Sequence, residues 1–258
     1  MAAERLGARL RCPRTGSDGR FLSEKRSPPA DGTEADWTSR RRAPAPTLSA
    51  QLRDETREEH FAVEAAFALE SRLGSYGAYG GLLLALRGFY RPVEAALSSV
   101  AGWNELNPTV DIASRRRADL LDEDLDGLRI EIPVGRAGPP SPGLVVDSVA
   151  KGLGCIYVLE GSALGGQVVA RRARASLGEG VPVAFFSSAG RENLRGDWRL
   201  LQGALDGFGA CHGPASSVEV VASARRTFAA LGAWLGSQSP DRGDCRLAPR
   251  HVSPRLVR

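Results

Sequence analysis

Aromatic residues are scarce in this chain and make up only 6% of its 258 residues. Hydrophobic residues nevertheless reach 42%, so a core must be built mainly from Ala, Leu and Val. That composition favours helices over sheets. The sequence also contains no Asn-Gly hairpin signal and no run of alternating strands. We therefore predict an all-α fold.

Cysteine is also rare, and the four cysteines have no spacing typical of a metal site. They are Cys12, Cys155, Cys211 and Cys245. The N-terminus carries charges but no apolar segment, so we expect no signal peptide. These absences fit a protein of the reducing cytoplasm.

Lysine is nearly absent, and the positive charge, almost all arginine, is concentrated at the two ends of the chain. Residues 1–46 carry ten basic and six acidic residues, residues 237–258 carry five and two, and residues 47–236 carry nineteen and twenty-two. The mildly acidic middle argues against a nucleic-acid-binding core. The basic ends could contact anionic surfaces, but their composition is typical of solvated, disordered chain.

The hydrophobic pattern divides the chain into three parts. Residues 1–46 are expected to form a disordered N-terminal extension, and residues 237–258 a disordered C-terminal tail. Residues 47–236 are expected to form one helical domain. Thr47 is the predicted N-cap of its first helix, and Pro92 is expected to bend or interrupt the second. The expected helices cover residues 47–73, 76–100, 113–128, 144–177, 190–208 and 216–235.

The first of these helices carries a histidine in an unusual setting. His60 continues a stripe of residues at steps of three or four, so we expect it on the inward face. Arg53, Arg57 and Glu64 lie within about 60° of it around the helix. An imidazole ligand, two arginines for the propionates and a glutamate to orient the imidazole suit an iron porphyrin. The alternative is a core histidine with ordinary charged neighbours.

The helix expected at 144–177 holds five glycines that helix propensity does not explain, since each interior glycine costs about 1 kcal/mol relative to alanine. Three of them fall within about 20° of one stripe, which leaves bare backbone along that face. Three explanations stay open: close packing against another helix, a membrane helix, or close contact with a planar ligand. The five are Gly152, Gly154, Gly161, Gly165 and Gly166, and the stripe holds the second, third and fourth.

Together the two helices resemble the haem oxygenase family. The resemblance rests on Arg53-x-x-Thr56-x-x-x-His60-x-x-x-Glu64, followed about a hundred residues later by Tyr157-Val-Leu-Glu-Gly-Ser-Ala-Leu-Gly-Gly-Gln167. It covers roughly residues 47–235 and is strongest towards bacterial members that supply biliverdin to bacteriophytochromes. It implies a single-domain helical bundle in which haem is sandwiched between a proximal and a distal helix.

The resemblance also implies the site residues. His60 would ligate the iron, with Glu64 beside it. The other implied residues are Arg53, Arg57 and Arg199 for the propionates, Gly161, Ser162 and Gly165 for catalysis, and Gly166 for binding haem. Mammalian-type members carry an aspartate where this chain has Ser162, so a different group must anchor the distal water network. Glu160 is expected to be structural.

The implied reaction is the oxygen-dependent opening of the haem ring to biliverdin, carbon monoxide and ferrous iron. Haem would be both substrate and cofactor, a reductase or ferredoxin would supply electrons, and a bacteriophytochrome could receive the biliverdin. We expect neither a nucleic-acid partner nor a membrane span.

Two other functions stay open. A haem carrier or sensor would keep His60 and lose the distal water network. A thiaminase-like enzyme shares the helical architecture but needs a nucleophilic cysteine in its pocket, and Cys155 is expected to lie about 100° from the Gly154 face.

Overall fold

A computed structural model describes residues 46–106, 110–132 and 144–238, and within these ranges the chain is helical, without a β-strand. This confirms the predicted all-α class. The extensions predicted at 1–46 and 237–258 lie almost entirely outside the described residues. The elements are α1 (Leu48–Glu55), α2 (Arg57–Phe67), α3 (Leu69–Arg72), α4 (Tyr76–Ser99), η1 (Trp103–Glu105), η2 (Ala113–Arg115), α5 (Ala118–Gly127), α6 (Val149–Leu177), α7 (Ala184–Ser187) and α8 (Leu194–Ser237).

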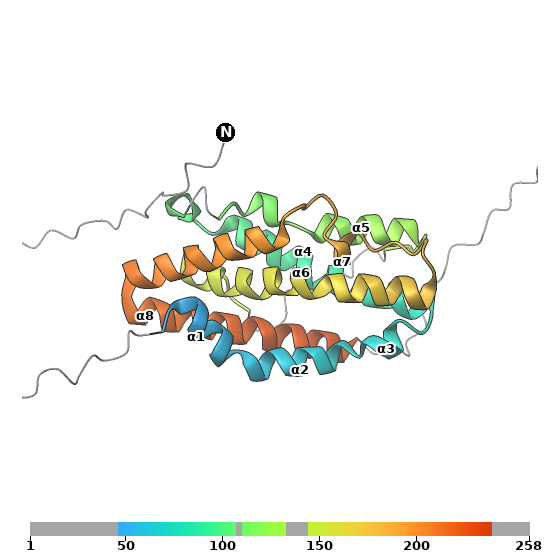
Figure 1. Ribbon diagram of the computed structural model, residues 1–258, viewed down its shortest axis with the longest axis horizontal. Helices are drawn as coiled ribbons and strands as arrows, with labels where there is room; N and C mark the ends of the chain where they lie inside the picture. Colours follow the sequence, from blue (N-terminus) through green and yellow to red (C-terminus); the bar gives the residue numbers. More distant parts are fainter. Residues whose placement is uncertain (1–45, 107–109, 133–143, 239–258) are drawn as a thin grey trace, which may run out of the picture.

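Helices α6 and α8 form the centre of the fold. Helix α8 is two helical arms joined at Gly213, whose backbone is not helical (φ 78°, ψ −176°), and the chain turns back on itself there (Figure 1). Pro214 follows, and a proline is well placed at the start of the second arm because it needs no N–H partner there. The two helices predicted at 190–208 and 216–235 correspond to these arms. α6 packs most extensively on α8, while α1 and α2 also pack on α8.

The first predicted helix, 47–73, is wrong as a continuous element. Thr47 does cap its start, because its side chain accepts a hydrogen bond from the Ala50 N–H. The helix then breaks at Thr56, whose hydroxyl donates to the Leu52 carbonyl at 2.6 Å, a bond that bends helices. It ends again at Ala68, which adopts a left-handed conformation (φ 42°). Residues 47–73 therefore form three short helices.

Pro92 does not interrupt its helix, because α4 is continuous from Tyr76 to Ser99 with the proline inside it. The helix predicted at 113–128 is the turn η2 followed by α5. The helix predicted from residue 144 begins at Val149, where the Ser148 side chain accepts a hydrogen bond from the Lys151 N–H and caps it. These differences arise at helix ends, where capping geometry decides the boundary.

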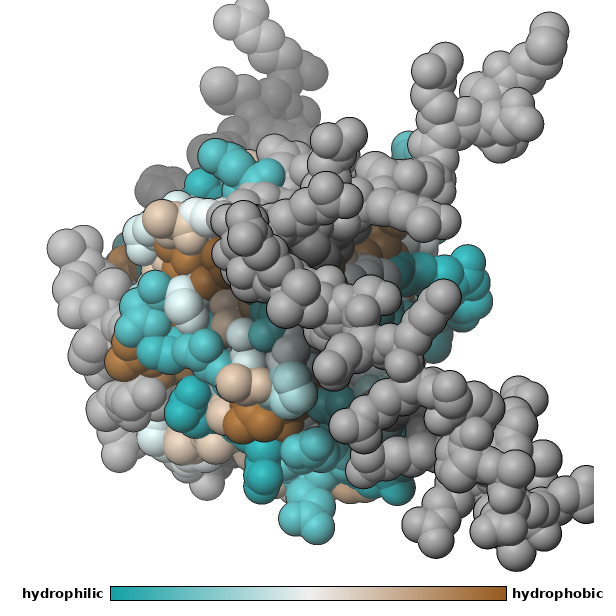
Figure 2. Space-filling model, turned by 90° about the vertical axis from the view of Figure 1, so that its left-hand side faces the viewer, coloured by the Kyte–Doolittle hydropathy of each residue, from teal (hydrophilic) through white to brown (hydrophobic). Residues whose placement is uncertain are grey.

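The helix α6 is long and apolar enough to cross a membrane, which is the alternative raised by its glycines. More than half of its most apolar window, 56%, is buried inside the fold, as expected of a central core helix. The end of the molecule seen in Figure 2 shows hydrophobic residues in separate patches among hydrophilic ones. We therefore read α6 as the core helix of this bundle.

Candidate functional site

His60 lies on α2 with its side chain about half exposed to solvent. The imidazole side chain is 54% exposed, and its Nδ1 lies 3.7 Å from the Glu64 carboxylate. Its ring packs edge-on against Phe228 of the second arm of α8, with centroids 5.7 Å apart. The expected inward stripe is buried up to Thr56, but His60 lies outside the core, and α2 beyond the break packs mainly on α8.

Two contacts tie α2 to the layer formed by α6 and α7. At its N-terminal end, the Thr56 hydroxyl interacts with the phenol of Tyr157 on α6. At its C-terminal end, Phe67 packs edge-to-face against Phe186 of α7, with ring centroids 6.2 Å apart. His60 lies on α2 between these two contacts.

Three of the α6 glycines are explained by close packing. A Cβ at Gly154 would lie 2.3 Å from the Val220 carbonyl oxygen of α8, so the two helix backbones touch there. A Cβ at Gly152 would lie 2.5 Å from the Trp103 ring. A Cβ at Gly166 would lie 2.7 Å from the Phe186 carbonyl oxygen, so the absence of a side chain lets α7 approach α6. Packing thus accounts for Gly166, and the predicted contact with haem stays a prediction.

Two α6 glycines have no packing partner that requires them. A Cβ at Gly165 would meet nothing within 4 Å, and one at Gly161 would only touch the Trp198 ring at 3.8 Å. Both lie on the predicted stripe, whose Gly154 end is covered by α8. Close helix packing therefore explains the Gly154 end of the stripe, and contact with a planar ligand stays a prediction for the open backbone at Gly161 and Gly165.

The predicted propionate arginines lie on the exterior. Arg53 pairs with Asp54 at 3.1 Å, and Arg57 lies 3.8 Å from the same carboxylate. Both side chains are largely exposed. Arg199 is exposed too, and it follows Trp198, the residue that faces Gly161. All three guanidinium groups can therefore be approached by a ligand carboxylate.

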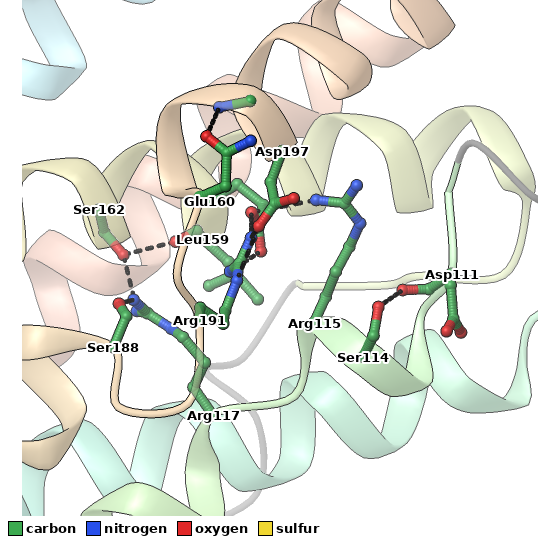
Figure 3. Close-up of polar contacts among 12 residues, drawn as sticks. Asp111, Ser114, Arg115, Arg117, Leu159, Glu160, Ser162, Ser188, Arg191 and Asp197 are labelled. Atoms are coloured by element: carbon green, nitrogen blue, oxygen red, sulfur yellow. Dashed lines mark hydrogen bonds and ion pairs between the residues drawn. The ribbon is translucent and has the colours of Figure 1, made fainter. Parts of the chain in front are cut away.

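Ser162 is the centre of a polar network that joins three segments. Its hydroxyl oxygen lies 2.6 Å from the Tyr90 phenol of α4. It also lies 3.2 Å from Nη2 of Arg117, and the hydroxyl donates to the Leu159 carbonyl at 2.6 Å (Figure 3). Arg117 also donates to Tyr90 at 3.1 Å and to Ser188 at 3.3 Å. Ser162, Tyr90 and Arg117 are called the hydroxyl network below.

The electrostatics of this network are unusual because Arg117 is 3% exposed. Its guanidinium carbon lies 4.5 Å from the Phe185 ring centroid and 5.4 Å from that of Tyr90. Burial raises the pKa of the Tyr90 phenol, although the charge of Arg117 opposes the shift. Burial also raises the pKa of Glu94, whose carboxylate accepts the backbone N–H groups of Arg117 and Ala118. A buried cation is thus held behind Ser162.

Glu160 is structural, as expected. Its buried carboxylate accepts two hydrogen bonds from Arg191, at 3.0 and 2.8 Å, and pairs with Arg115 at 3.0 Å (Figure 3). Arg191 also pairs with Asp197, near the start of α8. This cluster fixes the segment between α7 and α8 on α6, next to Gly161.

Cys155 cannot serve as a nucleophile. Its side chain is completely buried, and burial raises the pKa of its thiol to about 12. A thiol with that pKa is protonated at neutral pH, whereas the thiolate is the reactive form. The thiaminase-like alternative therefore has no support from this cysteine.

Sequence reasoning missed the hydroxyl network as a unit. Arg117 ends the run Arg115-Arg116-Arg117, which has the composition of an exposed basic segment. No local signal distinguishes the buried third arginine from the exposed second one. The position of Tyr90 in the sequence does not reveal its partner on α6.

Comparison with solved structures finds haem oxygenases. The haem oxygenase from Leptospira interrogans matches with a TM-score of 0.57 and 22% identity, over 74% of this chain and 100% of that one. The NO- and CO-bound haem oxygenase from Neisseria meningitidis matches with 0.59 and 22%, over 81% and 100%. Haem oxygenase 2 from Chlamydomonas reinhardtii, solved without haem, matches with 0.60 and 19%, over 76% and 100%.

No family profile and no curated protein matches the sequence. At these identities the structural matches establish the architecture, and each solved chain is covered over its whole length. This chain therefore has the all-α fold of the haem oxygenases.

Proposed function

We propose that this protein is a haem oxygenase that binds haem between α2 and α6 and opens its ring to biliverdin, carbon monoxide and ferrous iron. The observation that carries the proposal is that the chain offers both an accessible His60 on α2 and open backbone at Gly165 on α6. The fold shared with solved haem oxygenases supports it.

The side chains present fit a haem group. Nδ1 of His60 faces Glu64, and among the described residues Nε2 has no hydrogen-bond partner, which leaves it available for iron. A carboxylate beside the other ring nitrogen is the usual way to orient a metal-bound histidine. The bare backbone at Gly161 and Gly165 leaves room for a flat ring to approach α6.

Each part of the chain then has a task. Haem, when bound, supplies the iron and the ring carbon at which oxygen reacts. Arg53, Arg57 and Arg199 orient the ring by pairing with its propionates, because charge-assisted hydrogen bonds are strong and directional. Ser162 binds the Tyr90 phenol and the Arg117 guanidinium next to the open backbone of Gly161 and Gly165. Oxygen and electrons from a reductase or ferredoxin complete the reaction in the cytoplasm, and a bacteriophytochrome is the proposed recipient of biliverdin.

The test has two stages. Titration with haem should give a 1:1 complex with the absorption spectrum of a histidine-ligated haem. Aerobic addition of an electron donor should then convert this spectrum to that of biliverdin. A complex that forms but keeps its spectrum would identify a carrier or sensor, and the failure of haem to bind would refute the whole proposal.

A further inference from the structure

We propose that Arg117 is a positioning residue that locks the Ser162 hydroxyl and places a positive charge behind the open glycine surface of α6, so that the distal side favours anionic ligands. The inference rests on the proposed function, because the ligands in question bind on the distal side of haem. It identifies the group that anchors the distal polar network in a chain with Ser162 in place of aspartate.

The partners of Arg117 are the first argument. In the part of the chain that the structure describes, its guanidinium contacts the hydroxyls of Tyr90, Ser162 and Ser188 and two aromatic rings, and it forms no ion pair with a carboxylate. Glu94 is the nearby acid: its oxygens accept backbone N–H groups and not the guanidinium, so its interaction with the Arg117 charge is through space and without a direct ion pair. Hydroxyls and ring faces solvate a cation without neutralising it, so its field extends beyond the network.

The protons of the network have one arrangement that satisfies every contact. Ser162 has a single proton, and it goes to the Leu159 carbonyl, which can only accept. The Tyr90 hydroxyl therefore donates to Ser162, and Nη2 of Arg117 donates to both hydroxyl oxygens. Ser162 is thus left with no proton to offer a ligand, and the guanidinium charge is what the network presents to the distal side.

Ser162 lies between the Arg117 guanidinium and the open surface at Gly165. Ser162 and Gly165 are three residues apart on α6 and are therefore neighbours on its surface. Both are exposed residues, and nothing lies within 4 Å of a Cβ at Gly165. The Arg117 charge is consequently separated from that surface by one hydroxyl. Because Arg117 itself is only 3% exposed, water screens its charge less than it screens an arginine at the protein surface.

The test compares an anionic with a neutral iron ligand in the ferric haem complex, using optical titrations with sodium azide and with imidazole. Arg117→Gln should weaken azide binding about tenfold or more and leave imidazole binding within about twofold. Arg117→Lys, which keeps the charge, should restore most of the azide affinity. Arg116→Gln is the matched control, because Arg116 is the exposed neighbour and its charge is screened by water and salt.

Several outcomes would overturn the inference while haem binding through His60 persists. These are wild-type azide affinity in Arg117→Gln, an equal loss in Arg116→Gln, no rescue by Arg117→Lys, or a parallel loss of imidazole affinity. If Arg117→Gln does not fold, Arg117→Met offers an apolar chain of similar length that also removes the charge. Failure of the wild-type chain to bind haem would instead refute the proposed function itself.

Discussion

The rings of Phe67 and Phe186 pack edge-to-face with centroids 6.2 Å apart, and this contact holds the C-terminal end of α2 on α7. The backbone of Phe186 in turn rests on Gly166 of α6. One residue of α7 therefore sets the spacing between the helix that carries His60 and the helix that carries Gly165. The site depends on the packed glycines as well as on the open ones.

The packed glycines should not tolerate a methyl group. Gly154→Ala and Gly166→Ala should each lower the free energy of unfolding by about 1–3 kcal/mol, because the new Cβ would overlap backbone atoms that cannot move aside easily. Thermal or denaturant unfolding measures the effect. Gly81→Ala is the control, since a Cβ there meets nothing within 4 Å. Equal stability of all three variants would contradict the packing shown here.

The open glycine should show the opposite behaviour. Gly165→Ala should leave the haem-free protein as stable as the wild type or more stable, by up to about 1 kcal/mol. The same methyl group should weaken haem binding or slow turnover, because it projects into the space assigned to haem. Gly152 points away from the glycine stripe, so the sequence alone predicts that it tolerates alanine. It is nevertheless unsuitable as a control, because a Cβ there would overlap the Trp103 ring. Normal haem binding and turnover in Gly165→Ala would place haem elsewhere.

Arg53 and Arg199 should orient haem without supporting the fold. Both are exposed, and an exposed pair such as Arg53 with Asp54 contributes at most about 1 kcal/mol to stability. Alanine at either position should leave the melting temperature nearly unchanged, and should weaken haem affinity or alter the ratio of biliverdin isomers. Chromatography of the product measures that ratio. Wild-type affinity together with an unchanged ratio in both variants would assign the propionates to other residues.

The stability of the fold should depend on pH through Glu94. Its pKa is raised by burial, so the folded state holds this proton more tightly than the unfolded state does. The resulting stabilisation is present below the ordinary pKa of 4.5 and is lost as the pH rises through the higher folded value. Glu94→Gln should remove this dependence and become more stable relative to the wild type as the pH rises from about 4 to 8. A stability difference that is constant with pH would contradict the shift.

The fold class and most helices could be predicted because periodicity and composition are local properties. Thr47 as a cap and the glycine-rich central helix follow from such signals. The break at Thr56 could not be predicted, because it depends on the Thr56 hydroxyl donating to the Leu52 carbonyl and not to water. Helical geometry also placed Gly154 and Gly165 on one face, but it could not show that α8 covers only one end of it.

The site was predictable only where one helix carries several of its residues. His60, Arg53, Arg57 and Glu64 share α1 and α2, so their spacing could be read directly. The hydroxyl network brings together residues from α4, α6 and the start of α5. Residues so far apart in the sequence meet only through tertiary packing, which their spacing along the chain does not predict. The resemblance pointed to Ser162 as a catalytic candidate, which stays a prediction, whereas its contacts with Tyr90 and Arg117 appear only in three dimensions.

The most direct test of the account is a single-turnover spectrum of the haem complex in air with an electron donor, recorded for the wild type, His60→Ala and His212→Ala. His212 is the control, because its ring stacks on Phe208 and its Nδ1 lies 3.1 Å from the Phe208 carbonyl oxygen on α8, outside the proposed site. We predict biliverdin from the wild type and His212→Ala, and loss of both histidine ligation and turnover in His60→Ala. An unchanged ferric spectrum and full turnover in His60→Ala, or no biliverdin from the wild type, would contradict the account.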